Sequence, residues 1–245
     1  MDNSGKFQGL FLVLALLVLA CGIGYASTNV YKGLTEFRSY DRYVTVKGLA
    51  TRDVTADIGL WPISYTETGN DLVQLQDLMD QRAKTVLSFL SKYNIDASSA
   101  EMQQLNVQDL LAQSYRQAGA EQSRYILTQT ILVRTTDVEA LAKAAQGVGT
   151  LVRQGVVLAQ GGSGPTYLFT KLNDIKPEMI AEATRNARDA AAQFAADSGQ
   201  AVGGIRSAYQ GIFQILPRDE TYILPEAQQI NKTVRVVSTL DFYLE

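Results

Sequence analysis

The side chains that most often carry catalysis are scarce in this sequence. The chain of 245 residues contains no histidine, which removes the commonest general base and the commonest metal ligand. Its one cysteine, Cys21, cannot form an intrachain disulfide or a cysteine-based zinc or iron–sulfur site. No Ser-x-x-Lys occurs, so a common spacing of a serine nucleophile with a lysine base is also missing.

Paired carboxylates are the remaining candidates for acid–base chemistry or metal binding. Asp219 and Glu220 are adjacent in a predicted loop, and Asp53 and Asp57 flank one end of a predicted strand. A solvated loop and surface charge account for these pairs, and acidic metal motifs such as D-x-D-x-D are absent from the sequence. We therefore expect a protein that is not an enzyme, with no catalytic residue, no cofactor and no metal site.

The charge pattern also argues against nucleic acid as a partner. The formal net charge is -3 and the sequence pI is about 5.2. Nucleic-acid-binding domains usually carry a basic stripe, whereas lysine and arginine are scattered along this chain.

The N-terminal residues 1–28 predict a transmembrane helix. No charged residue lies between Lys6 and Lys32, and residues 10–21 are almost continuously Leu, Val, Ala and Phe. About 20 apolar residues, rising ~1.5 Å each, cross a hydrocarbon core of ~30 Å. We expect a retained signal anchor that contacts membrane lipid, followed by a polar stem over residues 29–41.

The expected location is the inner (cytoplasmic) membrane, with a single pass and the C-terminal domain in the periplasm. Two alternatives for the N-terminal segment stay open. Small residues around Gly24-Tyr25-Ala26 allow signal-peptide cleavage, and Val18-Leu19-Ala20-Cys21 resembles a lipobox that would lipidate Cys21.

Residues 42–245 predict one α+β domain. Period-2 alternation predicts strands and helical spacing of apolar residues predicts helices, in the order β-β-α-β-β-α-β-α-β-β. Paired strands between helices indicate an antiparallel-rich sheet with helices packed on one face. The predicted strands are 43–50, 54–66, 102–111, 124–135, 167–172, 204–216 and 233–244, and the predicted helices are 71–93, 137–153 and 177–198.

Residues with capping preferences mark the helix ends. Asn70 and Asp137 are expected to cap the first two helices, because short polar side chains accept from the first free amides. Pro177 suits the first position of the third helix, and Gly199 suits the left-handed residue just past its end. The inner face of that third helix is mostly alanine, so the helix can approach the sheet closely. The Gly-rich residues 160–165 predict a turn.

Two groups of apolar residues are candidates for an interface. Trp61, Ile63 and Tyr65 lie on a strand that Pro62 marks as an edge strand or a bulge, since proline donates no ladder hydrogen bond. Interfaces bury aromatic residues of this kind. The second group is Tyr222, Ile223 and Leu224. Ordinary packing in the core or within a loop is an equally good interpretation of both groups.

Two blocks of sequence resemble the SIMPL-domain family of bacterial envelope proteins, which includes a periplasmic immunogenic protein. In the first block, Val44–Gly48 and Arg52–Ile58 are similar to the family's opening hairpin. In the second, Ala183–Gly199 resembles its Ala-rich helix, followed by Gly203-Gly204-Ile205 as the start of a strand. The likeness covers residues 42–244. Two departures are an apparent insertion over 217–231 and Arg188-Asp189, where the family commonly has a basic residue.

The resemblance implies an envelope protein associated with stress tolerance, and some family members form large ring-like or channel-like homo-oligomers. It brings no catalytic residue. Our hypothesis is a membrane-anchored, extracytoplasmic homo-oligomeric scaffold or cage-like assembly. The alternative is an extracytoplasmic binding or sensor module that recognises a small molecule or an envelope partner through the aromatic edge.

Overall fold

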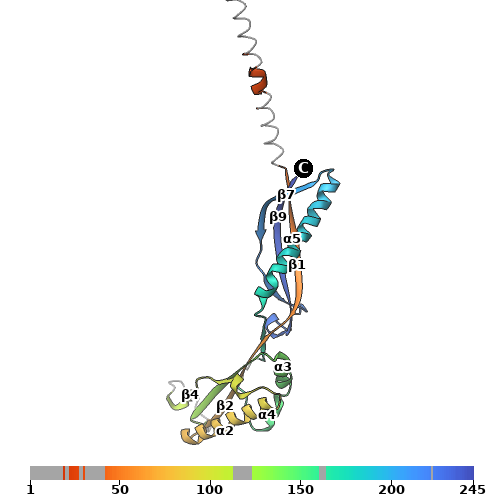
Figure 1. The fold of residues 1–245 in the computed structure, drawn as a ribbon. Helices are drawn as coiled ribbons and strands as arrows, with labels where there is room; N and C mark the ends of the chain where they lie inside the picture. Colours follow the sequence, from red (N-terminus) through yellow and green to blue (C-terminus); the bar gives the residue numbers. More distant parts are fainter. Residues whose placement is uncertain are drawn as a thin grey trace, which may run out of the picture. The chain divides into compact units, whose positions relative to one another are not determined.

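The computed structural model describes residues 19, 22–27, 30, 42–112, 123–159, 164–221 and 223–245 (Figure 1). These residues divide into two compact units. Unit 1 takes its described residues from 1–50, 180–212 and 236–245, and unit 2 takes them from 51–179 and 213–235. Each unit therefore draws on parts of the chain that are distant in sequence.

The predicted transmembrane helix over 1–28 lies largely outside the described residues. Within it, residues 22–27 are helical. None of the helices in the described part of the chain is both long and apolar enough to span a bilayer.

The first sheet has the strand order β1-β9-β7, and β8 pairs with β9 as well. β1 and β9 run antiparallel, because the Leu244 amide donates to the Arg42 carbonyl and the Thr45 hydroxyl donates to Asp241. β7 and β8 also pair antiparallel with β9. The strands are β1 (Tyr43–Thr55), β7 (Val202–Gln210), β8 (Gln214–Pro217) and β9 (Asn231–Leu244).

Helix α5 (Leu172–Asp197) packs its alanine face on this sheet. Ala187 and Ala191 form a buried cluster with Val46, Leu240 and Phe242. The predicted close approach is confirmed, because a Cβ on Gly48 would stand 1.8 Å from the carbonyl oxygen of Ala183. Gly199 has φ +69° just beyond the helix, as predicted for its left-handed end.

The second sheet lies in unit 2 and is antiparallel throughout. Its strand order is β3-β5-β2-β6, with β4 also paired to β5. The central pair, β2 and β5, stays in register from Gly59–Thr135 to Gly69–Tyr125. The strands are β2 (Ile58–Gly69), β3 (Ala100–Met102), β4 (Asn106–Asp109), β5 (Tyr125–Thr135) and β6 (Thr166–Leu168).

The two faces of the β2–β5 pair differ in chemistry. Odd-numbered residues of β2 join the core with α2 (Leu72–Ser91), α3 (Val138–Gln146) and α4 (Gly149–Arg153). Even-numbered residues carry hydroxyl pairs, with Ser64–Thr130 at 2.6 Å and Thr66–Thr128 at 3.0 Å. The helices of unit 2 therefore contribute to the core on one face of this sheet. Short 3-10 turns occur at Ala97–Ser99, Leu110–Ala112 and Glu226–Gln228.

The α+β class with antiparallel pairing is confirmed, but the single sheet and the opening hairpin are wrong. β1 and β2 follow each other closely yet belong to different sheets, because the chain changes partners between them. The Ala56 amide donates to the Ile230 carbonyl, whereas the Asp57 amide donates to the Leu168 carbonyl. The turn therefore falls at 56–57, later than the break at residues 51–53 expected from the sequence.

Several predicted bounds also change for local reasons. Asp71 caps α2 through Val73 N and Gln74 N, while Asn70 accepts from Arg124 N instead. The strand predicted over 102–111 is interrupted, because the three residues 103–105 stand opposite two residues of β5.

The helix predicted over 137–153 is correctly capped by Asp137, which accepts from Ala140 N at 2.9 Å, but it breaks at Gly147. A Cβ on Gly147 would stand 2.0 Å from the Tyr93 hydroxyl, so a residue without a side chain fits there. α5 starts at Leu172, five residues before Pro177, which lies inside the helix. β6 is shorter than the strand predicted over 167–172.

Candidate functional site

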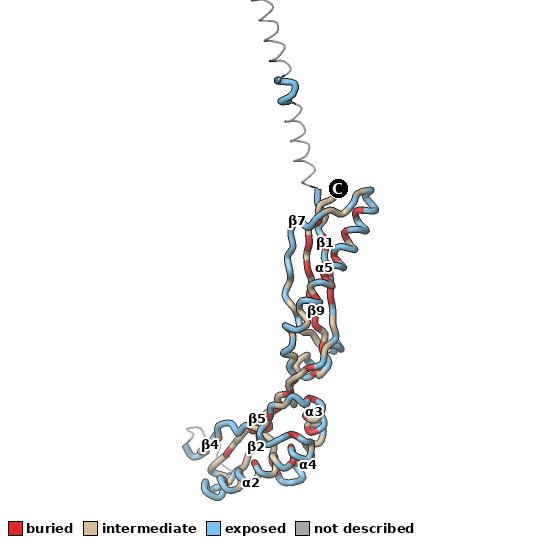
Figure 2. The backbone as a smooth tube through the Cα atoms, viewed as in Figure 1, coloured by how far each residue is buried: buried red, intermediate tan, exposed pale blue. Residues whose placement is uncertain are grey.

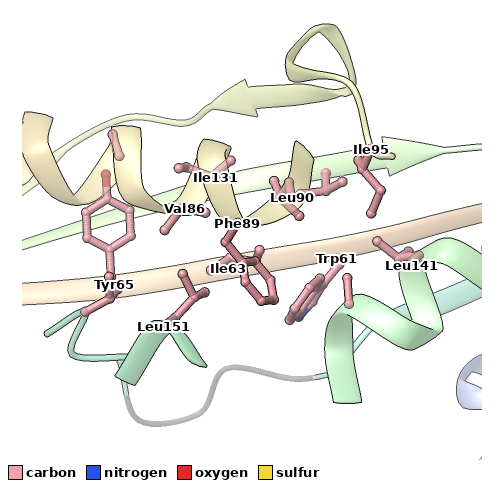
Figure 3. Packing of buried hydrophobic residues seen from close by; sticks show 14 of the residues in the cluster. Trp61, Ile63, Tyr65, Val86, Phe89, Leu90, Ile95, Ile131, Leu141 and Leu151 are labelled. Atoms are coloured by element: carbon pink, nitrogen blue, oxygen red, sulfur yellow. The ribbon is translucent and has the colours of Figure 1, made fainter. Parts of the chain in front are cut away.

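The first group of candidate interface residues lies in the core of unit 2. Trp61, Ile63 and Tyr65 are 5%, 2% and 0% exposed. Figure 3 shows them along β2 beside Phe89 and Leu151. The sequence left core packing and an interface open for these residues, and the structure gives them the core-packing role.

The hydroxyl group of Tyr65 has a hydrogen-bond partner inside this core. Its hydroxyl donates to Gln129 Oε1 at 2.9 Å on the neighbouring strand. Burial raises the pKa of Tyr65 to about 12, and the charge of Asp80 adds to the shift. The phenol is therefore a neutral hydrogen-bond donor at any physiological pH.

Pro62 stands on the edge of β2 that faces away from β5. On that edge the Ser64 carbonyl accepts from Ala159 N and the Thr66 amide donates to Val157 O, both at 2.9 Å. Backbone groups two residues apart in a strand point to the same side, so the Pro62 nitrogen also faces this edge. β2 is not an edge strand, because β6 and residues 157–159 pair along this side of it; Pro62 lies between these two paired stretches.

A cavity of about 150 Å³ opens at this edge. It lies beside Trp61 and Pro62, between the end of α3 and the segment that pairs with Ser64. Its described lining is Trp61, Pro62, Ile63, Ser64, Ala145, Val148, Leu158, Ala159 and Gly164.

The second group of candidate residues lies on the connection between β8 and β9. Gln229, which is 6% exposed, holds this connection from inside. Its Nε2 donates to the Asp219 carbonyl at 2.8 Å and to the Leu224 carbonyl at 3.0 Å, and its Oε1 accepts from Asp219 N at 3.3 Å. One side chain thus cross-links both arms of the loop.

Lys232 makes a second cross-link and is fully buried. Its ammonium donates to the Glu226 carbonyl at 2.6 Å and to the Glu226 carboxylate. Burial of an unpaired charge is strongly unfavourable, so these two hydrogen bonds compensate the burial of the ammonium. We call residues 218–230 with these two cross-links the clamped loop.

The clamped loop exposes apolar side chains at its tip. Ile223 is 92% exposed and Leu224 is 42% exposed. The Leu224 amide donates to the Thr221 hydroxyl at 3.2 Å, which closes the turn around the tip. Tyr222, the third candidate of this group, lies outside the described residues.

In unit 1, β7 is an edge strand of the first sheet as far as the described residues show. Figure 2 shows it almost entirely as exposed. Tyr209, in β7, is 71% exposed, and Ile212, just after the end of β7, is 77% exposed. Register shifts on either side of Ile205 interrupt the ladder with β9, and such bulges protect a free edge from uncontrolled pairing.

Three of the four carboxylates considered for chemistry, Asp53, Asp57 and Asp219, each have a partner of their own. Asp53 accepts from the Thr233 hydroxyl and Asp219 pairs with Arg218. Asp57 accepts from the amide and hydroxyl of Thr170; burial raises the pKa of Asp57, but these hydrogen bonds outweigh it and lower the value below normal. Among the described residues, no three His, Cys, Asp or Glu side chains cluster as metal ligands would.

Sequence reasoning missed Lys232 and Gln229. For Lys232 a signal was present, because it shares the even-numbered positions of β9 with the buried Val234, Val236 and Leu240. A charged residue in a buried alternation indicates a buried polar contact. No comparable pattern marks Gln229.

The sequence matches a known protein family over most of its length. Residues 44–237 match SIMPL, described as a protein of unknown function (DUF541). The chain belongs to the SIMPL family. The match spans both units of this SIMPL chain, including the contact of Gly48 with α5 and the clamped loop. No curated protein matches the sequence.

Proposed function

We propose that this SIMPL protein is a homo-oligomeric scaffold or cage-like assembly at the inner membrane. Its N-terminal helix lies in the bilayer, its folded part lies in the periplasm, and its role is linked to envelope stress tolerance. The observation that carries the proposal is the clamped loop, which holds Ile223 92% exposed.

The clamped loop combines two features that are unfavourable in an isolated monomer. It buries the ammonium of Lys232, and it leaves the whole of an isoleucine side chain in water. Both features are explained if the tip is buried against a partner. The cross-links then hold the tip in one conformation, so that little entropy is lost when the partner binds.

The N-terminal segment favours another copy of the same chain as that partner. An anchor confines every copy to one membrane face, which raises the effective concentration of each copy for the others. Contacts that are weak in solution are then sufficient for assembly.

Mass photometry of the full-length protein in detergent tests the assembly. We expect wild-type particles to contain several copies, and Ile223→Asp to shift them to smaller particles. Val73→Asp is the matched control, because Val73 is an exposed valine (73%) in the first turn of α2, where a carboxylate is tolerated. A wild-type protein that is strictly monomeric would overturn the proposal.

The location is tested separately by protease treatment of cells after removal of their outer layers. We expect the folded part to be cut while a cytoplasmic control protein stays intact. Full protection of the folded part would contradict the periplasmic location.

A further inference from the structure

The backbone of β7 is hydrogen-bonded to a neighbouring strand on one side only. The Gly211 amide donates to the Val237 carbonyl at 2.9 Å, and the register of β7 on β9 is unbroken from there back to Ser207. Backbone groups alternate between the two sides of a strand, so the odd-numbered residues of this stretch bond to β9. Ala208 and Gln210 therefore direct their amides and carbonyls to the opposite edge, where no described strand pairs with β7.

This free edge has one regular stretch, which is short. Register shifts around Ile205 interrupt the ladder with β9 on one side, and the strand ends at Gln210 on the other. The regular stretch is therefore 207–211, with Tyr209 at its centre. Tyr209 is 71% exposed, and its neighbours in the strand are exposed as well. An exposed aromatic residue beside unpaired backbone groups is typical of an edge that adds a further strand.

The opposite edge of the first sheet is β1, and a side chain of α5 occupies one of its backbone acceptors. The Arg42 carbonyl accepts from Leu244 N, so the even-numbered residues of β1 bond to β9 and Leu49 directs its carbonyl outward. Asn186 of α5 donates to that carbonyl at 2.7 Å. A second copy of the chain therefore offers β7, rather than β1, as the edge that is free to pair. Two identical edges that pair meet about a two-fold axis.

We propose that β7 is an interface between two copies of this chain, which pair their β7 strands antiparallel about a two-fold axis at Tyr209. Ala208 of each copy then exchanges two backbone hydrogen bonds with Gln210 of the other copy. This register uses the whole of the regular stretch. The pairing names one interface of the proposed homo-oligomer, so it rests on the proposed function, but it uses no residue of the clamped loop.

The side chains of β7 are compatible with a second copy. Arg206 is the one charged residue of this strand, and its guanidinium lies over the Tyr43 ring at 4.0 Å. In the proposed pairing the two Arg206 residues are separated by six positions along the strands, or roughly 20 Å, so their repulsion is screened. The two Tyr209 residues stand directly opposite each other, in the type of pair whose side chains approach most closely.

Disulfide trapping tests the register of this pairing. Tyr209→Cys in a Cys21→Ala background places two cysteines opposite each other with Cα atoms about 4.5 Å apart, within the range of a disulfide. Ala208→Cys in the same background is the matched control, because its two copies lie on a diagonal of roughly 8 Å. On oxidation of the full-length protein in detergent, we expect at least about tenfold more linked dimer for Tyr209→Cys than for Ala208→Cys.

Ala208→Pro tests the backbone hydrogen bonds separately. The Ala208 amide points to the free edge, so proline removes a bond to the partner and keeps the ladder with β9, and such an edge position tolerates proline. In mass photometry of the full-length protein, we expect Ala208→Pro to lower the particle mass about twofold or more, because an isologous contact joins copies in pairs. Ala208→Ser keeps the amide and should leave the mass unchanged.

The outcomes separate this pairing from the assembly as a whole. A monomeric wild-type protein would overturn both proposals. Wild-type assemblies that keep their full mass in Ala208→Pro, or that Tyr209→Cys links no more than Ala208→Cys, would overturn the pairing of β7 alone. A Tyr209→Cys cross-link to a different protein, without the linked dimer, would assign this edge to an extended peptide and would also overturn the pairing. Cross-linking decides the matter if Ala208→Pro does not fold.

Discussion

Gly48 in β1 and Ala183 in α5 are in backbone contact. A Cβ on Gly48 would stand 1.8 Å from the Ala183 carbonyl oxygen and 2.7 Å from the Ala187 amide nitrogen. Both are main-chain atoms of a helix, so neither can rotate away as a side chain could. This contact sets how closely α5 approaches the first sheet.

Gly48→Ala should therefore destabilise the protein by about 3 kcal/mol or more, at the upper end of overpacking effects. Urea unfolding followed by circular dichroism measures the change. Gly204→Ala is the matched control, because Gly204 lies in β7 with no heavy atom within 4 Å of a Cβ. An equal effect of the two variants would contradict the role given to the contact.

The ion pair inside the clamped loop should respond unequally to loss of its two partners. Glu226→Ala leaves the fully buried Lys232 ammonium with only the Glu226 carbonyl, and should cost about 3–5 kcal/mol. Lys232→Met leaves a carboxylate that is 37% exposed and can be hydrated, so it should cost less than about 1.5 kcal/mol. Chemical denaturation compares the two, and a larger loss for Lys232→Met would contradict the argument.

Asp241 should make the stability of the first sheet depend on acid pH. Hydrogen bonds from Ser207 and Thr45 lower the pKa of Asp241 below its ordinary value of 3.8, and Arg206 adds to the shift. Because the folded pKa is the lower one, the stabilisation is present above pH 3.8 and is lost as pH falls through the folded pKa.

Carboxyl NMR titration measures this pKa directly. Ser207→Ala removes one of the two hydroxyl donors and should raise the pKa toward 3.8. A pKa at or above 3.8 in the wild type, or one that Ser207→Ala does not move, would refute the prediction.

Arg82 should matter more for stability than an ordinary surface arginine. Its Nε donates to Glu67 at 2.7 Å and its Nη1 donates to the Gln154 carbonyl at 3.3 Å, which links α2 to β2 and to the end of α4. Glu67 is 12% exposed, so Arg82→Ala leaves a largely buried carboxylate without its partner and should cost about 2–3 kcal/mol.

A double-mutant cycle with Glu67→Gln isolates the pair. We expect Arg82→Ala to cost clearly less in the Glu67→Gln background than in the wild type. Arg124→Ala is a control at the more exposed pair with Asp109 and should cost clearly less than Arg82→Ala. Additive effects of Arg82→Ala and Glu67→Gln would show that the two side chains are not coupled.

Features that depend on neighbouring residues could be predicted from the sequence. The alanine face of α5, the cap at Asp137 and the left-handed Gly199 follow from local chemistry, and the structure has all three. The strand predicted over 233–244 is also present, as β9.

Choices between distant partners could not be predicted. A period-2 pattern shows which face of a strand is buried but does not name the neighbouring strand, so the pairing of β1 with β9 was missed. For the same reason Trp61 fitted an interface and a core equally well. Its burial depends on α2, α3 and α4, whose positions over β2 are not encoded near Trp61.

The pairing of β1 with β9 also determines the order in which the molecule can fold. Thr45 and Asp241 are neighbours in the sheet but are 196 residues apart in the chain. Contacts of such high sequence separation form late, because a long loop must close first. During synthesis, the second sheet and α2 are complete well before β9 emerges, and the backbone edge of β1 that pairs with β9 has no such partner until then. The newly made chain is therefore most vulnerable to aggregation and proteolysis in this interval, and a chaperone that shields β1 would act at this stage.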